Sequence, residues 1–210
     1  MRKNLHAKEK EILKKHGRIV GVDEVGRGTL AGPVVSACVV LDRGSLRKKG
    51  WKGVQDSKIL SDEKRRELMV FIQQNAFEIG VGMASNEEID RLNILNASLL
   101  SMKRAIEFLK NDPPHIFVDG RFVVPGIRYS QEAVVKGDEK MLSIAAASVV
   151  AKVMRDDLMF QYDEQFPGFG FGKHKGYNTP FHRKRLLAQG PCEIHRMSFL
   201  PVQEAANKNR

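Results

Sequence analysis

Acidic residues stand at or just beyond the ends of three apolar segments in this chain. Asp23 and Glu24 follow the segment RIVGV, Asp119 ends HIFVD, and Asp138 comes after AVVKG. A single aspartate beside a glycine is more often an ordinary turn residue, but three such segment ends in one chain favour a common site. If these ends converge, the carboxylates form an all-oxygen site suited to Mg²⁺ or Mn²⁺ rather than to zinc.

A carboxylate cluster of this kind favours phosphodiester hydrolysis, in which one or two divalent cations activate a water and stabilise the charge at phosphorus. The sequence has no Gly-x-Ser-x-Gly motif, so serine hydrolase chemistry has little support. One geometric condition applies, because consecutive strand residues point to opposite faces. Asp23 and Glu24 share an ion only where the strand ends or twists, and Gly26 makes such a break plausible.

Two further segments are suited to contact with nucleic acid. Gly26, Arg27 and Gly28 follow the acidic pair, and glycines let the backbone approach a sugar-phosphate closely. The alternative is a hairpin turn with an exposed arginine. Residues 168–177, GFGFGKHKGY, combine flexible backbone, cations and aromatic rings, which suits phosphate neutralisation and stacking. The candidate phosphate contacts in this second segment are Lys173, His174 and Lys175.

The histidines and cysteines do not form a recognisable metal or disulfide pattern. His174, His182 and His195 do not stand at zinc-site spacing with either cysteine, and we interpret them as phosphate neighbours or surface residues. Cys38 and Cys192 are too few for a disulfide scaffold, which indicates a reducing compartment.

The composition is that of a globular protein. The 210-residue chain is 42% hydrophobic and 29% charged, which excludes disordered, collagenous and coiled-coil classes. Its longest uncharged run, residues 28–41, is shorter than the about twenty apolar residues of a membrane span. The N-terminus runs into a charged stretch without the apolar core of a signal peptide. We therefore expect a cytoplasmic monomer that does not contact membranes.

The formal net charge of +10 is unevenly distributed along the chain. Residues 1–18 carry a net charge of +5 and residues 171–210 a net charge of +6, whereas residues 19–170 carry −1. A near-neutral body between two basic ends suits a polyanion held beside a carboxylate site. Basic ends can equally serve only to keep a fold soluble, so charge alone leaves both interpretations open.

Strands must bring the acidic residues to one place. Segments rich in β-branched residues predict a hairpin of residues 18–25 and 33–41, with further strands at 77–84, 116–119 and 129–135. Two strands precede the first long helix, which argues against a doubly wound parallel sheet. The sequence therefore predicts an α/β domain with a mixed sheet.

Helices are predicted over residues 61–76, over 85–109 in one or two pieces, and over 141–166. The last of these is rich in alanine in its first half, so it should pack closely against the sheet. We expect one domain over residues 1–210, with its core at about 18–166 and a basic helical region at about 167–210.

A series of short motifs follows in a fixed order along the chain. The motifs are GVDEVGRG (21–28), DSK (56–58), NIL (93–95), VDG (118–120), KGD (136–138), SIAAAS (143–148), AKV (151–153), RD (155–156) and HKGY (174–177). Together they resemble bacterial ribonuclease HII over about residues 18–202. The combination is specific, although no single motif is.

The resemblance implies a ribonuclease H-like fold, in which a central mixed five-stranded sheet is flanked by helices and followed by a C-terminal helical extension. It implies an endonuclease that hydrolyses the RNA strand of RNA/DNA hybrids and cuts 5′ of ribonucleotides embedded in duplex DNA. The cofactor would be Mn²⁺ or Mg²⁺, the products a 3′-hydroxyl and a 5′-phosphate, and the role the removal of ribonucleotides from DNA. Ribonuclease HIII, the nearest relative, has a substantial extra N-terminal domain, whereas about seventeen residues precede the first expected strand here, which favours HII.

The same resemblance assigns roles to individual residues. The metal-binding catalytic acids are matched by Asp23, Glu24, Asp119 and Asp138. The loop that senses the ribose 2′-hydroxyl at the RNA–DNA junction is matched by Gly26, Arg27 and Gly28. A tyrosine that stacks on the next deoxyribose is matched by Tyr177, and a phosphate-contacting lysine by Lys58.

The chain departs from the family's usual pattern at two positions. Thr29 stands where proline commonly follows Gly-Arg-Gly, and Ile59 stands where a second lysine often follows Asp-Ser-Lys. The first departure concerns the rigidity of the turn and the second concerns affinity for phosphate. Neither changes the four acids.

The alternative function is a non-catalytic nucleic-acid-binding module with a vestigial acid cluster, which the basic ends support. The presence of all four acids argues against it, because a pure binder gains nothing from carboxylates near phosphates. Dependence on a divalent ion distinguishes the two, since a binder has no turnover to lose when a chelator is added. A junction resolvase on the same fold is disfavoured by residues 26–28 together with Tyr177.

Overall fold

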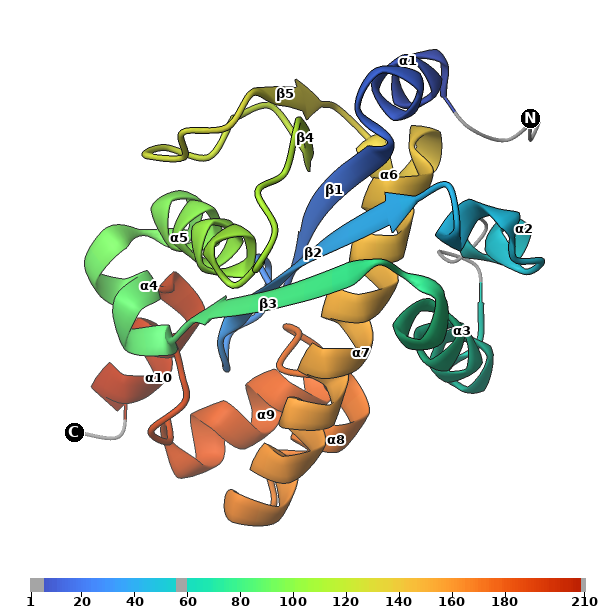
Figure 1. Ribbon diagram of the computed structural model, residues 1–210. Helices are drawn as coiled ribbons and strands as arrows, with labels where there is room; N and C mark the ends of the chain where they lie inside the picture. Colours follow the sequence, from blue (N-terminus) through green and yellow to red (C-terminus); the bar gives the residue numbers. More distant parts are fainter. Residues whose placement is uncertain (1–5, 56–59, 209–210) are drawn as a thin grey trace.

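A five-stranded sheet forms the centre of the computed structural model, which describes residues 6–55 and 60–208 (Figure 1). Its strands are β1 (Arg18–Val25), β2 (Val34–Asp42), β3 (Glu78–Ala84), β4 (Ile116–Asp119) and β5 (Gln131–Val134), in the order β3-β2-β1-β4-β5. β1, β2 and β3 pair antiparallel, whereas β4 runs parallel to β1 and β5 parallel to β4. The expected hairpin and mixed sheet are confirmed.

Helices cover both faces of this sheet (Figure 1). α7 (Leu142–Gln165) and α3 (Asp62–Asn75) pack on one face, and α5 (Ile94–Glu107) packs on the other. Successive side chains of β1 point to opposite faces of the sheet. Ile19 therefore belongs to the core beneath α7, and Val20 belongs to the core beneath α5. Both faces of the strand are therefore buried, as its apolar sequence requires.

Small residues bring α7 close to β1. A Cβ atom added to Gly21 would stand 2.2 Å from the carbonyl carbon of Ser143, so the two backbones are in direct contact. The alanines at 145, 146 and 147 are fully buried at the same interface. This confirms the close packing that the alanine-rich segment predicts, and it sets the α7 side chains against the end of β1.

The remaining helices are α1 (Ala7–His16), α2 (Trp51–Gln55), α4 (Asn86–Leu92), α6 (Gly137–Lys140), α8 (Phe171–His174), α9 (Pro180–Gln189) and α10 (Leu200–Lys208), with a 3-10 turn at Ser45–Arg47. The sequence analysis does not anticipate α1 and α2. Asn93, with φ of 69°, separates α4 from α5 within the segment predicted as one or two helices. In the described part of the chain, no helix is long and apolar enough to cross a membrane.

α1 contributes a buried carboxylate to the first turn of α7. Glu9 is fully buried, and its Oε1 accepts hydrogen bonds from Ser143 N at 2.9 Å and Ser143 Oγ at 2.7 Å. Its Oε2 accepts one from Leu142 N at 3.2 Å. Because Met141, the residue before α7, makes no side-chain cap, Glu9 satisfies these amide groups from a distant segment.

The region after α7 folds back onto the loop that joins β1 and β2. Thr29 forms an antiparallel bridge with Tyr177, and Ala31 forms one with His195. The carboxylate of Asp90 in α4 accepts hydrogen bonds from the backbone of residues 197 and 198, both at 2.8 Å. The C-terminal region is thus part of the support of this loop.

Two histidines in this region, His182 and His195, form a buried, neutral hydrogen-bond chain. Cys192 N donates to His195 Nδ1 at 2.9 Å, so His195 Nε2 donates to His182 Nε2 at 3.1 Å. His182 Nδ1 in turn donates to the Tyr177 carbonyl at 2.9 Å. Burial lowers the pKa of both His182 and His195 to about 4. The interpretation of these two as surface residues or phosphate neighbours is wrong, because they are 0% and 1% exposed.

Replacement of Glu9 tests the support of α7. We expect Glu9→Gln to lower the free energy of unfolding by about 1–2 kcal/mol, because the amide nitrogen cannot accept the bonds from α7 and the negative charge is lost. Urea unfolding measures this change. Glu11→Gln, an exposed position on the same helix, should change stability by less than about 0.5 kcal/mol. Equal effects of the two variants would contradict the assignment.

The histidine chain predicts acid sensitivity. The pKa of both imidazoles is about 4 in the folded protein and 6.5 without the fold, so between these values only the unfolded chain takes up protons. The two imidazoles therefore contribute a fall in the free energy of unfolding as the pH decreases from about 6.5 towards 4, whereas the raised pKa values of the carboxyl groups of Asp23 and Glu24 act in the opposite direction. His195→Asn should be less stable than wild type at pH 7.5, and its deficit relative to wild type should shrink as the pH decreases, measured by urea unfolding of both proteins across this range. A deficit that does not change with pH would refute the assignment.

Candidate active site

The predicted acids lie where two parallel strands end side by side. Val22 of β1 pairs with Val118 of β4, and β4 ends one residue later at Asp119. β1 continues through Asp23 and Glu24, which remain paired with β2. Beyond Val22, β1 therefore has no β4 neighbour along its edge. The side chains of Asp23 and Glu24, which point to opposite faces of β1, both lie at this end of the sheet.

Asp23 lies on the α7 face of β1. It is 5% exposed, forms a side-chain hydrogen bond with Ser148 of α7, and accepts one from Glu24 N at 2.7 Å. Burial raises its pKa well above the ordinary value, and the negative charges of Glu24 and Asp119 raise it further. Its hydrogen bonds oppose this shift but do not cancel it.

Glu24 lies on the opposite face, against α5. Its Oε1 accepts a hydrogen bond from Arg27 Nη1 at 3.1 Å, whereas Oε2 is buried and has no hydrogen-bond partner among the described residues. Burial raises its pKa to about 7, Arg27 lowers it, and Asp119 raises it. Asp23 and Glu24 thus stand on opposite faces of β1, and the charge of Asp119 at the end of β4 raises the pKa of both carboxyl groups.

Asp119 and Asp138 are connected through the start of α6. Asp119 Oδ1 accepts a hydrogen bond from Gly137 N at 2.6 Å, and Asp138 is the next residue along the chain. Both acidic residues are half-buried. The turn that follows β5 therefore brings the fourth predicted acid to the end of β4, where the third one lies.

The arrangement fits a divalent cation by its chemistry. Within residues 6–55 and 60–208, no three Asp, Glu, His or Cys side chains are drawn together closely enough to enclose an ion. The donors at the end of β1 and β4 are nevertheless all carboxylate oxygens, one of which, Glu24 Oε2, is buried without a partner. Burial raises the pKa of Asp23 and Glu24, and repulsion from Asp119 adds to this shift; a bound cation would relieve that repulsion.

A small pocket of about 20 Å³ opens beside these acids. Glu24, Arg27 and Asp119 line one side, and α5 supplies the other. Glu24 and Ser98, which both line this pocket, carry the two buried side-chain oxygens that have no hydrogen-bond partner among the described residues, Glu24 Oε2 and Ser98 Oγ. The sequence analysis missed Ser98, because a serine in a helix carries no signal of its own. The remaining lining residues are Leu95, Leu99, Met102, Gly120, Arg121 and Phe122.

The loop of residues 26–28 comes shortly after Glu24, and hydrogen bonds from a buried arginine hold its backbone carbonyls. Arg196, fully buried, donates from Nη2 to the Gly26 carbonyl at 2.6 Å and from Nη1 to the Arg27 carbonyl at 2.9 Å. The Arg27 side chain is exposed, and a Cβ added to Gly28 would meet no atom within 4 Å. The outer side of this loop is therefore accessible while its carbonyls are held.

A second buried arginine fastens the rest of the loop. Arg155 of α7 donates to the carbonyls of Pro33 at 3.0 Å and Ala31 at 3.1 Å, and to Thr29 Oγ1 at 2.9 Å. Burial lowers the pKa of Arg155 to about 10 and that of Arg196 to about 9. Sequence reasoning missed both as loop supports, although an Arg-Asp motif at 155–156 contributes to the resemblance.

Tyr177 lies beside the same loop and is 42% exposed. Of the expected phosphate contacts nearby, Lys173 is exposed. His174 instead donates to the Phe169 carbonyl at 2.8 Å and accepts from Gly176 N at 3.2 Å, so both ring nitrogens are engaged in structural bonds. Lys175 donates to the Gly172 carbonyl and lies over the Phe160 ring at 3.2 Å. Lys58 lies outside the described residues.

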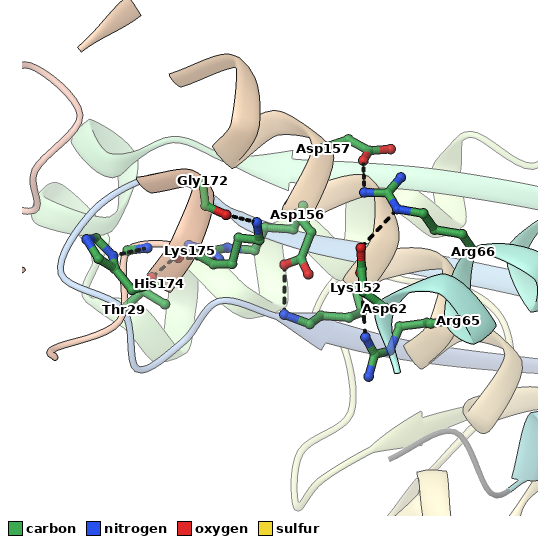
Figure 2. A network of polar contacts seen from close by, with 12 residues as sticks. Thr29, Asp62, Arg65, Arg66, Lys152, Asp156, Asp157, Gly172, His174 and Lys175 are labelled. Carbon is green, nitrogen blue, oxygen red and sulfur yellow. Dashed lines mark hydrogen bonds and ion pairs between the residues drawn. The ribbon is translucent and has the colours of Figure 1, made fainter. Parts of the chain in front are cut away.

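Charged side chains of α3 and α7 form a polar network that extends towards Lys175 (Figure 2). Lys152 donates to Asp156 at 2.7 Å within α7, and Arg66 of α3 pairs with Asp157 at 2.6 Å and with Asp62 at 3.1 Å. Figure 2 shows Thr29, His174 and Lys175 next to this network. Lys152 Nζ lies 6.0 Å from the centroid of the Tyr177 ring, so the tyrosine segment, residues 174–177, lies beside this charged side of α7.

The chain is similar to known proteins over most of its length. The family model of ribonuclease HII matches residues 20–202. The chain is 47% identical to Ribonuclease HII of Maricaulis maris, covering 94% of this chain and 91% of that protein. It is 50% identical to Ribonuclease HII of Clostridioides difficile, with coverages of 87% and 69%.

A solved structure shares the fold. The ribonuclease H2 of Pyrococcus horikoshii superposes with a TM-score of 0.78 at 25% identity, covering 91% of this chain and 98% of that one. The ribonuclease H-like fold inferred from the resemblance is therefore confirmed. With the family model spanning most of the sequence, the chain belongs to the ribonuclease HII family, endonucleases that act on the RNA of RNA/DNA hybrids.

Proposed function

We propose that this ribonuclease also cuts on the 5′ side of ribonucleotides embedded in duplex DNA, leaving a 3′-hydroxyl and a 5′-phosphate. One observation carries the proposal: the buried carboxylates at the end of β1 and β4 adjoin a loop whose carbonyls are held from behind and whose outer side is accessible. Catalytic and sugar-reading groups are thus neighbours. The corresponding role is removal of ribonucleotides from DNA in the cytoplasm.

Asp23, Glu24, Asp119 and Asp138 would hold the cofactor, one or two Mn²⁺ or Mg²⁺ ions. When bound, such an ion supplies Lewis acidity that activates water and neutralises charge on the phosphate. The chain's own contribution is to keep these carboxylates out of bulk water and oriented, Asp23 through Ser148 and Asp119 through Gly137 N. The partnerless Glu24 Oε2 supports this role.

The substrate is positioned by groups beside the acids. The backbone of residues 26–28 would contact the ribose 2′-hydroxyl, and the exposed ring of Tyr177 would stack on the neighbouring deoxyribose. Exposed Lys173, and Lys58 from the resemblance, remain proposed phosphate contacts. The basic C-terminal region adds sequence-independent attraction to the nucleic acid.

Cleavage of a defined duplex tests the proposed function. An end-labelled DNA duplex with one ribonucleotide should be cut once, on its 5′ side, with Mn²⁺ or Mg²⁺, and not with chelator. An all-DNA duplex should remain intact, and a long RNA/DNA hybrid should be cut at many positions. Retained binding without cleavage under every metal condition would instead support the non-catalytic binding module.

Asp119→Asn tests the assignment of the acids. We expect cleavage to fall by more than about a hundredfold, because loss of even an outer partner of a metal ligand costs about 10- to 100-fold. Binding of the duplex should persist. The melting temperature should not decrease, since the charge of Asp119 opposes ionisation of its two acidic neighbours. Asp112→Asn, an exposed carboxylate paired with Arg128, should cleave normally, and normal cleavage by Asp119→Asn would refute the site.

A further inference from the structure

Thr29 links the loop of residues 26–28 to the interior through both functions of its hydroxyl. The residue is fully buried, and its Oγ1 donates to the Gly26 carbonyl at 3.0 Å. The same oxygen accepts a hydrogen bond from Arg155 Nη2 at 2.9 Å. Because a hydroxyl has a single proton, and an arginine can only donate, these roles cannot be exchanged. The bonds supply rigidity that proline would supply by fixing φ.

The Gly26 carbonyl is held by two donors at once. It receives Thr29 Oγ1 at 3.0 Å and Arg196 Nη2 at 2.6 Å. Gly26 itself has φ of 103°, and a Cβ atom there would stand 2.2 Å from Arg155 Nε, so its backbone lies against that guanidinium. The peptide unit between Gly26 and Arg27 cannot rotate without breaking both bonds.

Holding these carbonyls fixes the direction of the amide groups that follow. In a planar trans peptide, the N–H points opposite to the C=O, and the chain contains no cis peptide bond in its described part. With the carbonyls of Gly26 and Arg27 turned towards Arg196, the N–H groups of Arg27 and Gly28 point away from it. These are donors suited to a ribose hydroxyl.

Thr29 also connects the loop to the tyrosine segment. It forms a bridge with Tyr177, and Leu30 N donates to the Gly176 carbonyl at 2.8 Å. Arg155, which donates to Thr29, also donates to the Lys175 carbonyl at 2.9 Å. The two parts expected to contact the ribonucleotide and its neighbour are therefore fixed to one guanidinium.

We propose that Thr29 is a positioning residue that determines specificity for a single ribonucleotide in DNA. Thr29 is buried and does not touch the substrate itself. Its hydroxyl fixes the direction in which the amide groups of the loop point and their distance from Tyr177. The proposal rests on the proposed cleavage at embedded ribonucleotides. A duplex with one ribonucleotide has a 2′-hydroxyl at a single position along the strand, whereas an RNA/DNA hybrid has one at every position of its RNA strand. A loosened loop should therefore impair cleavage of the first substrate more than cleavage of the second.

Thr29→Val tests this inference, because valine keeps the shape and loses both hydrogen bonds. We expect kcat/KM for the single-ribonucleotide duplex to fall about tenfold relative to kcat/KM for a long hybrid, because part of the free energy of the two lost hydrogen bonds affects only the first substrate. Thr29→Ser, which keeps the hydroxyl, should restore the wild-type ratio. Melting temperatures of all variants show whether each is folded under the assay conditions.

Ser85→Ala is the matched control for lost stability. Ser85 caps α4 by accepting from Glu88 N, a bond within that helix, so the variant should lose stability but keep the substrate ratio. An equal loss of activity by Thr29→Val on both substrates, or failure of Thr29→Ser to restore the ratio, would overturn the inference. Failure of the wild type to cut the single-ribonucleotide duplex would instead refute the proposed function, and the inference with it.

Discussion

Two buried guanidinium groups, those of Arg155 and Arg196, hold the functional end of this molecule together. Arg155 and Arg196 are fully buried, and in the described part of the chain neither forms an ion pair within 4 Å. Burial of an unpaired cation costs on the order of several kcal/mol, which here is offset by hydrogen bonds to carbonyl and hydroxyl oxygens. The accepting carbonyls belong largely to the loop after β1, which turns them inward towards the two guanidinium groups.

The carboxylate site shows the opposite compromise. Asp23 and Glu24 are buried beside Asp119, and their raised pKa values show that the folded protein destabilises the ionised form of both carboxyl groups. The arrangement is possible because β4 ends at Asp119 while β1 continues. The edge of β1 beyond that point is not covered by β4, so the carboxylates of Asp23 and Glu24 can lie beside it. A repulsive cluster of oxygens is therefore held ready by a sheet whose core is otherwise apolar.

The C-terminal region serves as a support as well as a basic surface. Asp90 holds the backbone at residues 197 and 198, and the neutral chain from His195 through His182 ends on the carbonyl of Tyr177. Its neutrality matters, because a second proton would set two N–H groups against each other at 3.1 Å. Orientation of the tyrosine segment thus depends on uncharged imidazoles in a region whose overall charge is strongly positive.

The sequence alone determined the mixed sheet, the long α7, the acids at strand ends and the family, because alternation, helical spacing and short motifs are local patterns. It did not reveal Glu9 beneath α7, the burial of His182 and His195, or the arginine supports. Those depend on contacts between distant positions, such as Arg196 and Gly26, which are 170 residues apart. Only the tertiary structure decides whether an arginine, a histidine or a threonine faces solvent or a buried carbonyl, because the same side chain satisfies either environment.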